Sequence, residues 1–309
     1  MNRKHKLTSV VAFPALSFSI FLLGFVLLTS HSDDASAQAL NMKGSKGGDP
    51  ITVDAEEGIE WRQNEFVFIA RGSARAVRGK MTINGDELRA YYREGSEAGT
   101  DIWRLDSLGN VKLSQPGQIA TGDNAVYDVD RGILVLKPLP GERARFVSGV
   151  EEVSSTGQIE FWETRGIAVA RGQAQAVQVV RDGRNTGKNR RLFADVLVAH
   201  LAKDAKGETA VQRIEAYDQV RIVTDEDTVT ASRGTFEVES GLATLVGAVR
   251  MVRAGSTLEG CRAVVDTKAG VSRLFACPPQ GGSAGDNAGG SRVRGQLVPK
   301  GTPAPKGAE

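Results

Sequence analysis

The carboxylates of this 309-residue chain that could serve as a general acid and base recur at one kind of position. A small residue precedes an aspartate in Gly85-Asp86, Gly122-Asp123 and Ala194-Asp195. Two carboxylates would suffice for a glycosidase. However, a pair that recurs from unit to unit is typical of a structural corner, where a small residue permits a bulge and Asp hydrogen-bonds nearby backbone. We therefore interpret these pairs as corners and predict no catalytic residue.

Other catalytic or cofactor-binding candidates are few. His200 is the one histidine after the first 40 residues, so a histidine-rich metal site is excluded and a serine triad would depend on this residue alone. We interpret His200 as a surface residue at a strand end. The chain has no phosphate-binding loop or dinucleotide fingerprint, and its net charge of +2 argues against a nucleic-acid partner. We predict no metal, no cofactor and no enzyme, although a carboxylate pair stays open as an alternative.

One basic cluster could contact the phosphates of an anionic ligand, because Arg and Lys bind such groups through charge-assisted hydrogen bonds. The alternative is a solvated hairpin tip. The cluster comprises Arg181, Arg184, Lys188, Arg190 and Arg191, opposed by Asp182.

The first 40 residues are typical of an export signal. Arg3, Lys4 and Lys6 precede a largely apolar run over residues 7–28, and small residues surround Ala37. The signal is either cleaved near Ala37 or retained as a membrane anchor, since the run is long enough to span a bilayer. In both cases the remaining chain lies outside the cytoplasm.

Two cysteines, Cys261 and Cys277, are consistent with that compartment. An even number of cysteines in an oxidising environment favours a disulfide. It would close a loop of about 16 residues and stabilise the fold by roughly 3 kcal/mol. Two free buried thiols are the alternative.

The residues that would position these groups belong to one repeated strand-turn-strand unit. Apolar and polar residues alternate with a period of two, and turn residues separate the runs. This pattern predicts an all-β fold of repeated antiparallel hairpins. Five weak copies begin near residues 70, 109, 170, 218 and 247.

A longer duplication lies over these units. Residues 70–77 recur at 170–177, and residues 127–132 recur at 236–241. We therefore expect a duplication of about 51–140 and 151–250, followed by an extra unit at 247–275. Composition further predicts a linker at 41–50, a flexible loop at 278–291, a last edge strand at 292–299 and a disordered tail at 300–309.

The apolar face of these strands carries many small side chains, including Ala70, Gly72, Ala74 and Ala76 and their counterparts one hundred residues later. Small side chains allow either close packing of two sheets or a groove that admits long apolar chains. Both interpretations stay open.

The order of several motifs resembles the LptA/OstA-like family of periplasmic lipopolysaccharide-transport bridge proteins. These motifs are Gly109-Asn110-Val111, Ile119 followed by Gly122-Asp123, the pair Tyr127-Asp128, and the final run from Arg292-Val293 to Leu297-Val298-Pro299. The resemblance covers about residues 51–299.

The resemblance implies an elongated, twisted, open-ended β-jelly-roll over residues 51–277 whose interior binds the acyl chains of lipopolysaccharide in the periplasm. Terminal strands near residues 51–55 and 293–298 would join inner-membrane and outer-membrane components of the transport machinery, or further copies of the chain as a homo-oligomer. Alternatives are an inner-membrane-anchored member of the system and an exported β-repeat enzyme or adhesin that acts on polysaccharide. The residues expected to face the lipid are Phe66, Phe68, Ala74, Ala76, Ile83, Val111, Leu113, Ile119, Tyr127, Val220, Ile222, Phe236 and Val249.

Overall fold

The computed structural model describes residues 51–94, 100–182, 185–203, 209–277 and 292–298. The predicted leader, linker, flexible loop and tail all lie outside these ranges. Most described residues belong to β-strands, and the described helices are two short 3-10 turns, η1 (Gln63–Glu65) and η2 (Glu163–Arg165). The predicted all-β fold is confirmed. Within the same ranges, the structure contains no helix with the length and hydropathy needed to cross a membrane.

Most strands that follow one another along the chain pair as antiparallel neighbours. Their bounds are β1 (Thr52–Asp54), β2 (Gly58–Arg62), β3 (Val67–Arg78), β4 (Met81–Glu94), β5 (Thr100–Gln115), β6 (Gln118–Asp128), β7 (Ile133–Lys137), β8 (Ala144–Ser148), β9 (Glu151–Ser155), β10 (Gln158–Trp162), β11 (Ile167–Asp182), β12 (Asn185–Lys203), β13 (Thr209–Val223), β14 (Asp227–Glu237), β15 (Leu242–Arg253), β16 (Ser256–Asp266), β17 (Val271–Phe275) and β18 (Arg294–Gln296).

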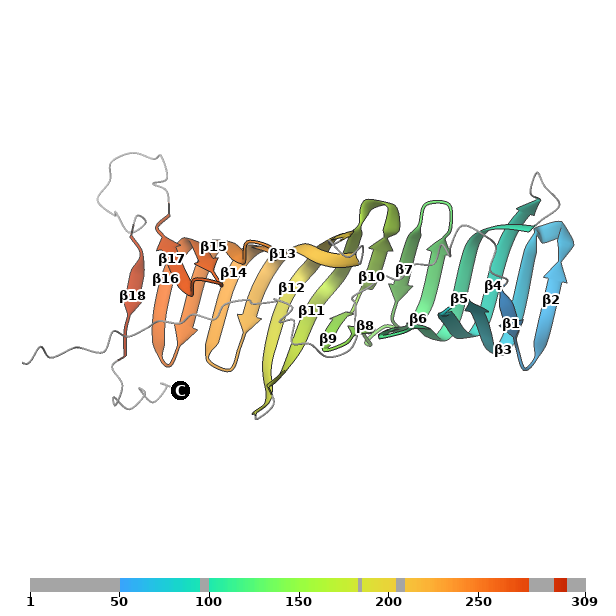
Figure 1. The fold of residues 1–309 in the computed structure, drawn as a ribbon, viewed down its shortest axis with the longest axis horizontal. Coiled ribbons are helices and arrows are strands. Elements are labelled where there is room, and N and C mark those ends of the chain that lie inside the picture. Colours follow the sequence, from blue (N-terminus) through green and yellow to red (C-terminus); the bar gives the residue numbers. More distant parts are fainter. Residues whose placement is uncertain (1–50, 95–99, 183–184, 204–208, 278–291, 299–309) are drawn as a thin grey trace, which may run out of the picture.

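The strands form one row along the long axis of the molecule, with β1 and β2 at one end and β17 and β18 at the other (Figure 1). Some positions in the row hold two short strands in place of one long strand. Thus β1 and β2 both pair with β3, β7 and β8 both pair with β6, and β17 and β18 both pair with β16. The row therefore starts and ends in pairs of short strands.

Bulges divide each long strand into two arms. The register of β3 against β4 shifts between Arg71 and Ala74, and the intervening Gly72 and Ser73 both have positive φ. Similar shifts recur in β5, β11, β13 and β15. Because a bulge bends its strand, residues of both arms face one shared interior. The predicted corner pairs Gly85-Asp86 and Ala194-Asp195 lie at such shifts.

The interior is an apolar core built by the period of two on both sides of each bulge. In β14, for example, Val229 and Ala231 point inward before the bulge and Phe236 points inward after it. Val220, Phe236 and Val249 are each exposed by no more than 2%. The core around these residues is therefore closely packed.

A disulfide joins Cys261 of β16 to Cys277, two residues beyond the end of β17, with a Cα–Cα distance of 4.8 Å. Residues 257–259 of β16 pair with β18 and residues 262–266 pair with β17. The disulfide thus holds the C-terminal edge at the boundary between its two short strands.

Candidate functional site

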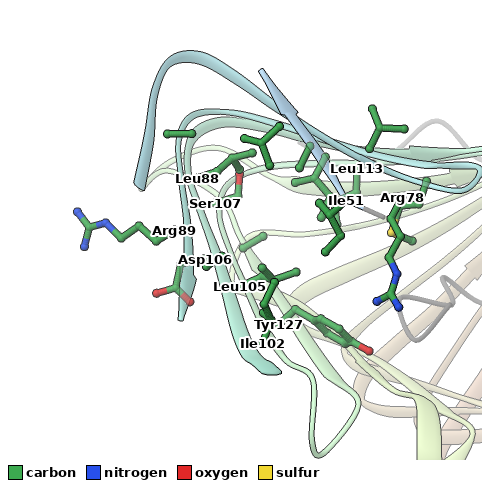
Figure 2. A pocket seen from close by; sticks show the side chains of 18 of the residues that line it. Ile51, Arg78, Leu88, Arg89, Ile102, Leu105, Asp106, Ser107, Leu113 and Tyr127 are labelled. Atoms are coloured by element: carbon green, nitrogen blue, oxygen red, sulfur yellow. The ribbon is translucent and has the colours of Figure 1, made fainter. Parts of the chain in front are cut away.

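A cavity of about 610 Å³ lies between the arms of the first strands (Figure 2). Apolar side chains dominate its wall. Val53 comes from β1, Phe68 from β3, Ile83 and Leu88 from β4, and Leu113 from β5. This volume lies within the range of roughly 300–1,000 Å³ that is common for ligand pockets.

The local sequence explains why the cavity forms here. Ala70 and Ala76 of β3 and Ala90 of β4 occupy inward positions, so the walls carry short side chains where longer ones would fill the space. Phe68 lies on the same inward face, two residues before Ala70, as the period of two of a strand requires. Opposite walls therefore remain apart.

The polar groups of the wall differ in direction. Arg89 and Asp106 point away from the cavity, whereas Arg78 and Tyr127 lie at one side of it (Figure 2). The Nε and one Nη of Arg104 donate hydrogen bonds to Asp106 at 2.7 and 2.8 Å, which leaves this carboxylate satisfied on the outer face.

Tyr127 is a buried phenol at this side of the cavity. Its hydroxyl donates a hydrogen bond to Glu163 Oε1 at 3.3 Å. Burial raises the pKa of Tyr127, and the charge of Glu163 raises it further, so the phenol is neutral at physiological pH. Tyr127 thus presents an uncharged hydroxyl.

The residues predicted to face lipid fall into three groups. Phe68, Ala76, Ile83, Leu113 and Tyr127 line the cavity. A second group lies in the closely packed core at 4% exposure or less, comprising Ala74, Val111, Val220, Ile222, Phe236 and Val249.

Phe66 and Ile119 form the third group and are exposed at 43% and 41%. Phe66 ends η1 in the left-handed conformation, and its ring packs edge-on against Tyr92. Ile119 lies between buried Gln118 and Ala120, so the alternation of β6 turns its side chain to the opposite, outer face. The inward placement of these two residues was wrong.

The small residues of the apolar face lie in two different environments. Ala70 and Ala76 line the cavity. Their counterparts Ala170 and Ala176 are buried at 3% and 6% exposure in the packed core. The stripe therefore lines the cavity in its first copy and lies in the packed core in its second, and the admission of long apolar chains stays a prediction.

The basic cluster is only partly described. The structure does not describe the side chains of Arg181, Arg184 and Lys188. Arg190 is half-buried, and burial lowers its pKa, whereas Arg191 is exposed. A common binding surface for these five residues stays a prediction.

His200 lies within β12 beside Arg213 of β13, with Nε2 3.6 Å from Glu215 Oε1. Its side chain is 39% exposed. This placement agrees with a surface residue near the end of a strand.

The sequence prediction missed several cavity residues, among them Arg78, Leu88, Ile102 and Leu105. For Leu88 the signal was present, because it continues the alternation once the bulge at residues 85–86 is allowed for. Arg78 also follows Ala74 and Ala76 on the inward positions of β3, but a charged residue is not expected in an apolar wall.

Fold and cavity together define an elongated all-β protein with bent strands, an apolar interior and two exposed edges. The family model described as LptA/(LptD N-terminal domain) LPS transport protein matches residues 52–156 and 173–271. The chain belongs to this family, as its motifs predicted. Family and fold point to a role in lipopolysaccharide transport and to a transport protein rather than an enzyme.

No curated protein matches the chain. One solved structure that matches is described as LptH, the LptA homologous periplasmic component of the conserved lipopolysaccharide transport device from Pseudomonas aeruginosa. The alignment has 10% identity and a TM-score of 0.20, and it covers 81% of this chain and 96% of that chain.

Proposed function

We propose that this protein binds lipopolysaccharide acyl chains in its apolar interior and bridges the inner and outer membranes during lipopolysaccharide transport. The observation that carries the proposal is the apolar cavity between the arms of the first strands. Each methylene removed from water contributes about 0.8 kcal/mol. An apolar interior therefore lowers the cost of moving acyl chains through an aqueous compartment.

The edges of the strand row support bridging by strand addition. Among the described strands, β1 and β2 pair only with β3, and β17 and β18 pair only with β16. Each end thus leaves backbone groups open to a further strand. Large apolar side chains are exposed near both edges, with Ile59 at 54%, Trp61 at 56% and Leu297 at 65%. The partners are inner-membrane and outer-membrane transport components, or further copies of this chain.

We place the mature chain in the periplasm. Its leader is either cleaved near Ala37 or retained as an inner-membrane anchor, and the retained form would make it the anchored member of the system. The mass of the mature protein from the native host distinguishes the two, since cleavage removes the first 37 residues.

Photocrosslinking tests the binding of acyl chains. A photoreactive residue at Phe68 or Ile83 lies in the cavity wall. Arg71 is the control, because its side chain forms ion pairs with Glu60 and Glu87 on the outer face. We expect lipopolysaccharide to label positions 68 and 83 and not position 71. Label at position 71 alone, or turnover of a glycan without label in the cavity, would contradict the proposal.

A further inference from the structure

Three basic residues contribute to the cavity wall, and they are not equivalent. Arg89 points away from the cavity (Figure 2) and forms an ion pair with Glu87. Lys80 lies exposed in the turn between β3 and β4. Arg78 follows Ala74 and Ala76 at the inward positions of β3, so its side chain enters the apolar interior.

Arg78 also retains hydrogen-bonding capacity. Its Nε is buried and has no hydrogen-bond partner among the described residues. The ion pairs found between described residues do not include Arg78. A buried N–H donor without a partner is costly. The structure therefore provides a site for an acceptor beside the Arg78 guanidinium.

The residues around Arg78 make one side of the cavity more polar than the other. Arg78 and Tyr127 lie at the same side of the cavity (Figure 2), and the positive charge of Arg78 acts on the Tyr127 phenol. Gln115, a further polar residue of the wall, donates a hydrogen bond to Gln118 Oε1 at 2.5 Å. Leu88, on another part of the wall, is apolar. The cavity thus has the positive charge of Arg78 at one side, whereas the wall near Leu88 is mainly apolar and includes the neutral hydroxyl of Ser107.

We infer that Arg78 binds the anionic headgroup, a phosphate or carboxylate, of an amphiphile whose alkyl chain occupies the cavity. This inference rests on the proposed function, because it requires the cavity to hold an alkyl chain. A guanidinium forms two parallel hydrogen bonds with a phosphate or carboxylate, which orients the headgroup at the polar side. Arg78 therefore selects anionic over neutral amphiphiles of equal chain length.

The test measures binding of dodecyl phosphate, dodecyl maltoside and inorganic phosphate to the full-length chain by calorimetry, each below its micelle concentration. Arg78→Gln removes the guanidinium, and Arg75→Gln is the matched control, since Arg75 is exposed on the outer face of the same strand. We expect Arg78→Gln to weaken dodecyl phosphate binding about tenfold, with no change for dodecyl maltoside. Arg75→Gln should change neither affinity.

Three outcomes would overturn the inference while leaving the proposed function standing. They are an unchanged affinity of Arg78→Gln for dodecyl phosphate, an equal loss for both dodecyl ligands, and inorganic phosphate binding as tightly as dodecyl phosphate. If neither dodecyl ligand binds the unmodified chain, the proposed function fails with it. If Arg78→Gln does not fold, Arg78→Lys, which retains the charge, is compared with Arg78→Met, which removes it. The inference then requires that Arg78→Lys prefers dodecyl phosphate over dodecyl maltoside more strongly than Arg78→Met does.

Discussion

Asn110 of β5 donates hydrogen bonds from Nδ2 to both carboxylate oxygens of Asp86 in β4, at 3.0 and 3.2 Å. Both residues lie where the register between these strands shifts. Gln219 and Asp195 form the corresponding contact at 3.3 Å in the later strands β13 and β12. Asp86 and Asp195 therefore accept from the neighbouring strand, whereas local backbone was the partner we predicted. These contacts connect the bends of adjacent strands.

The bend at Gly109 predicts a large cost for an added methyl group. Gly109 has φ +69, and a Cβ there would lie 2.1 Å from Asp86 Oδ2. We expect Gly109→Ala to lower the free energy of unfolding by more than about 2 kcal/mol, because backbone strain and a clash combine. Urea unfolding followed by circular dichroism measures this change.

Gly117→Ala is the matched control for that substitution. Gly117 has φ +76 but no atom within 4 Å of the added Cβ, so only the backbone is strained. Gly117→Ala should therefore lower the free energy of unfolding by about 1 kcal/mol. Equal losses in the two variants would show that the contact with Asp86 does not matter.

Reduction of the Cys261–Cys277 disulfide should destabilise the C-terminal edge. The bridge spans 16 residues and connects β16 with the end of β17. In the chain-entropy model its loss costs about 3 kcal/mol. We expect reductant to lower the melting temperature and to increase amide hydrogen exchange in β17. A variant with both cysteines replaced by serine should not respond to reductant, and a melting temperature unaffected by reduction would contradict the prediction.

Glu160 should stabilise the fold more than its counterpart Glu60. Glu160 is 5% exposed and accepts hydrogen bonds from Gln158, Trp162 and Arg171 at 2.7, 2.9 and 2.7 Å. Glu160→Gln should cost about 2 kcal/mol, because hydrogen bonds to a charged group are lost. The side chain of Glu60 is 46% exposed. Glu60→Gln should therefore destabilise the fold less than Glu160→Gln. Equal effects in chemical unfolding would contradict this.

The contribution of Glu160 should also depend on pH. Burial alone would raise the pKa of Glu160, but hydrogen bonds from Gln158, Arg171 and Trp162 outweigh burial and hold the pKa below its usual value. A carboxyl with a lowered folded-state pKa stabilises the fold above its unfolded pKa and loses this contribution as the pH falls through the folded value. The difference between the unmodified chain and Glu160→Gln should therefore be largest at neutral pH and shrink below about 4.5.

The exposed C-terminal edge predicts a site of association. Leu297, directly after β18, is 65% exposed. Leu297→Asp would bury a charge if another strand pairs with this edge. It should therefore weaken self-association more than about tenfold. Analytical ultracentrifugation of Leu297→Asp measures this effect. Val150→Asp is the control, because Val150 is 50% exposed in the turn between β8 and β9, away from either edge. Equal weakening in both variants, or a chain that stays monomeric, would contradict edge association.

The fold class followed from local features of the sequence. Alternating apolar residues and recurrent turns predict antiparallel hairpins, because side chains of a strand point to opposite faces in turn. The pairs Gly85-Asp86 and Ala194-Asp195 indicated where the strands bend, since a bulge favours small residues. The spacing of Cys261 and Cys277 permitted the bridge that the structure contains.

The position of the cavity could not be predicted from the sequence, because it depends on distances between strands that a local sequence pattern does not specify. Phe68 and Val220 both occupy inward strand positions, yet Phe68 lines the cavity and Val220 lies in the packed core. Ile119 took the outer face because the phase of the alternation is set by the register of the paired strands. The sequence by itself determined which strands form and where they bend. Only the tertiary structure decided where the two arms stay apart, because that separation depends on the combined volume of side chains distant in the chain.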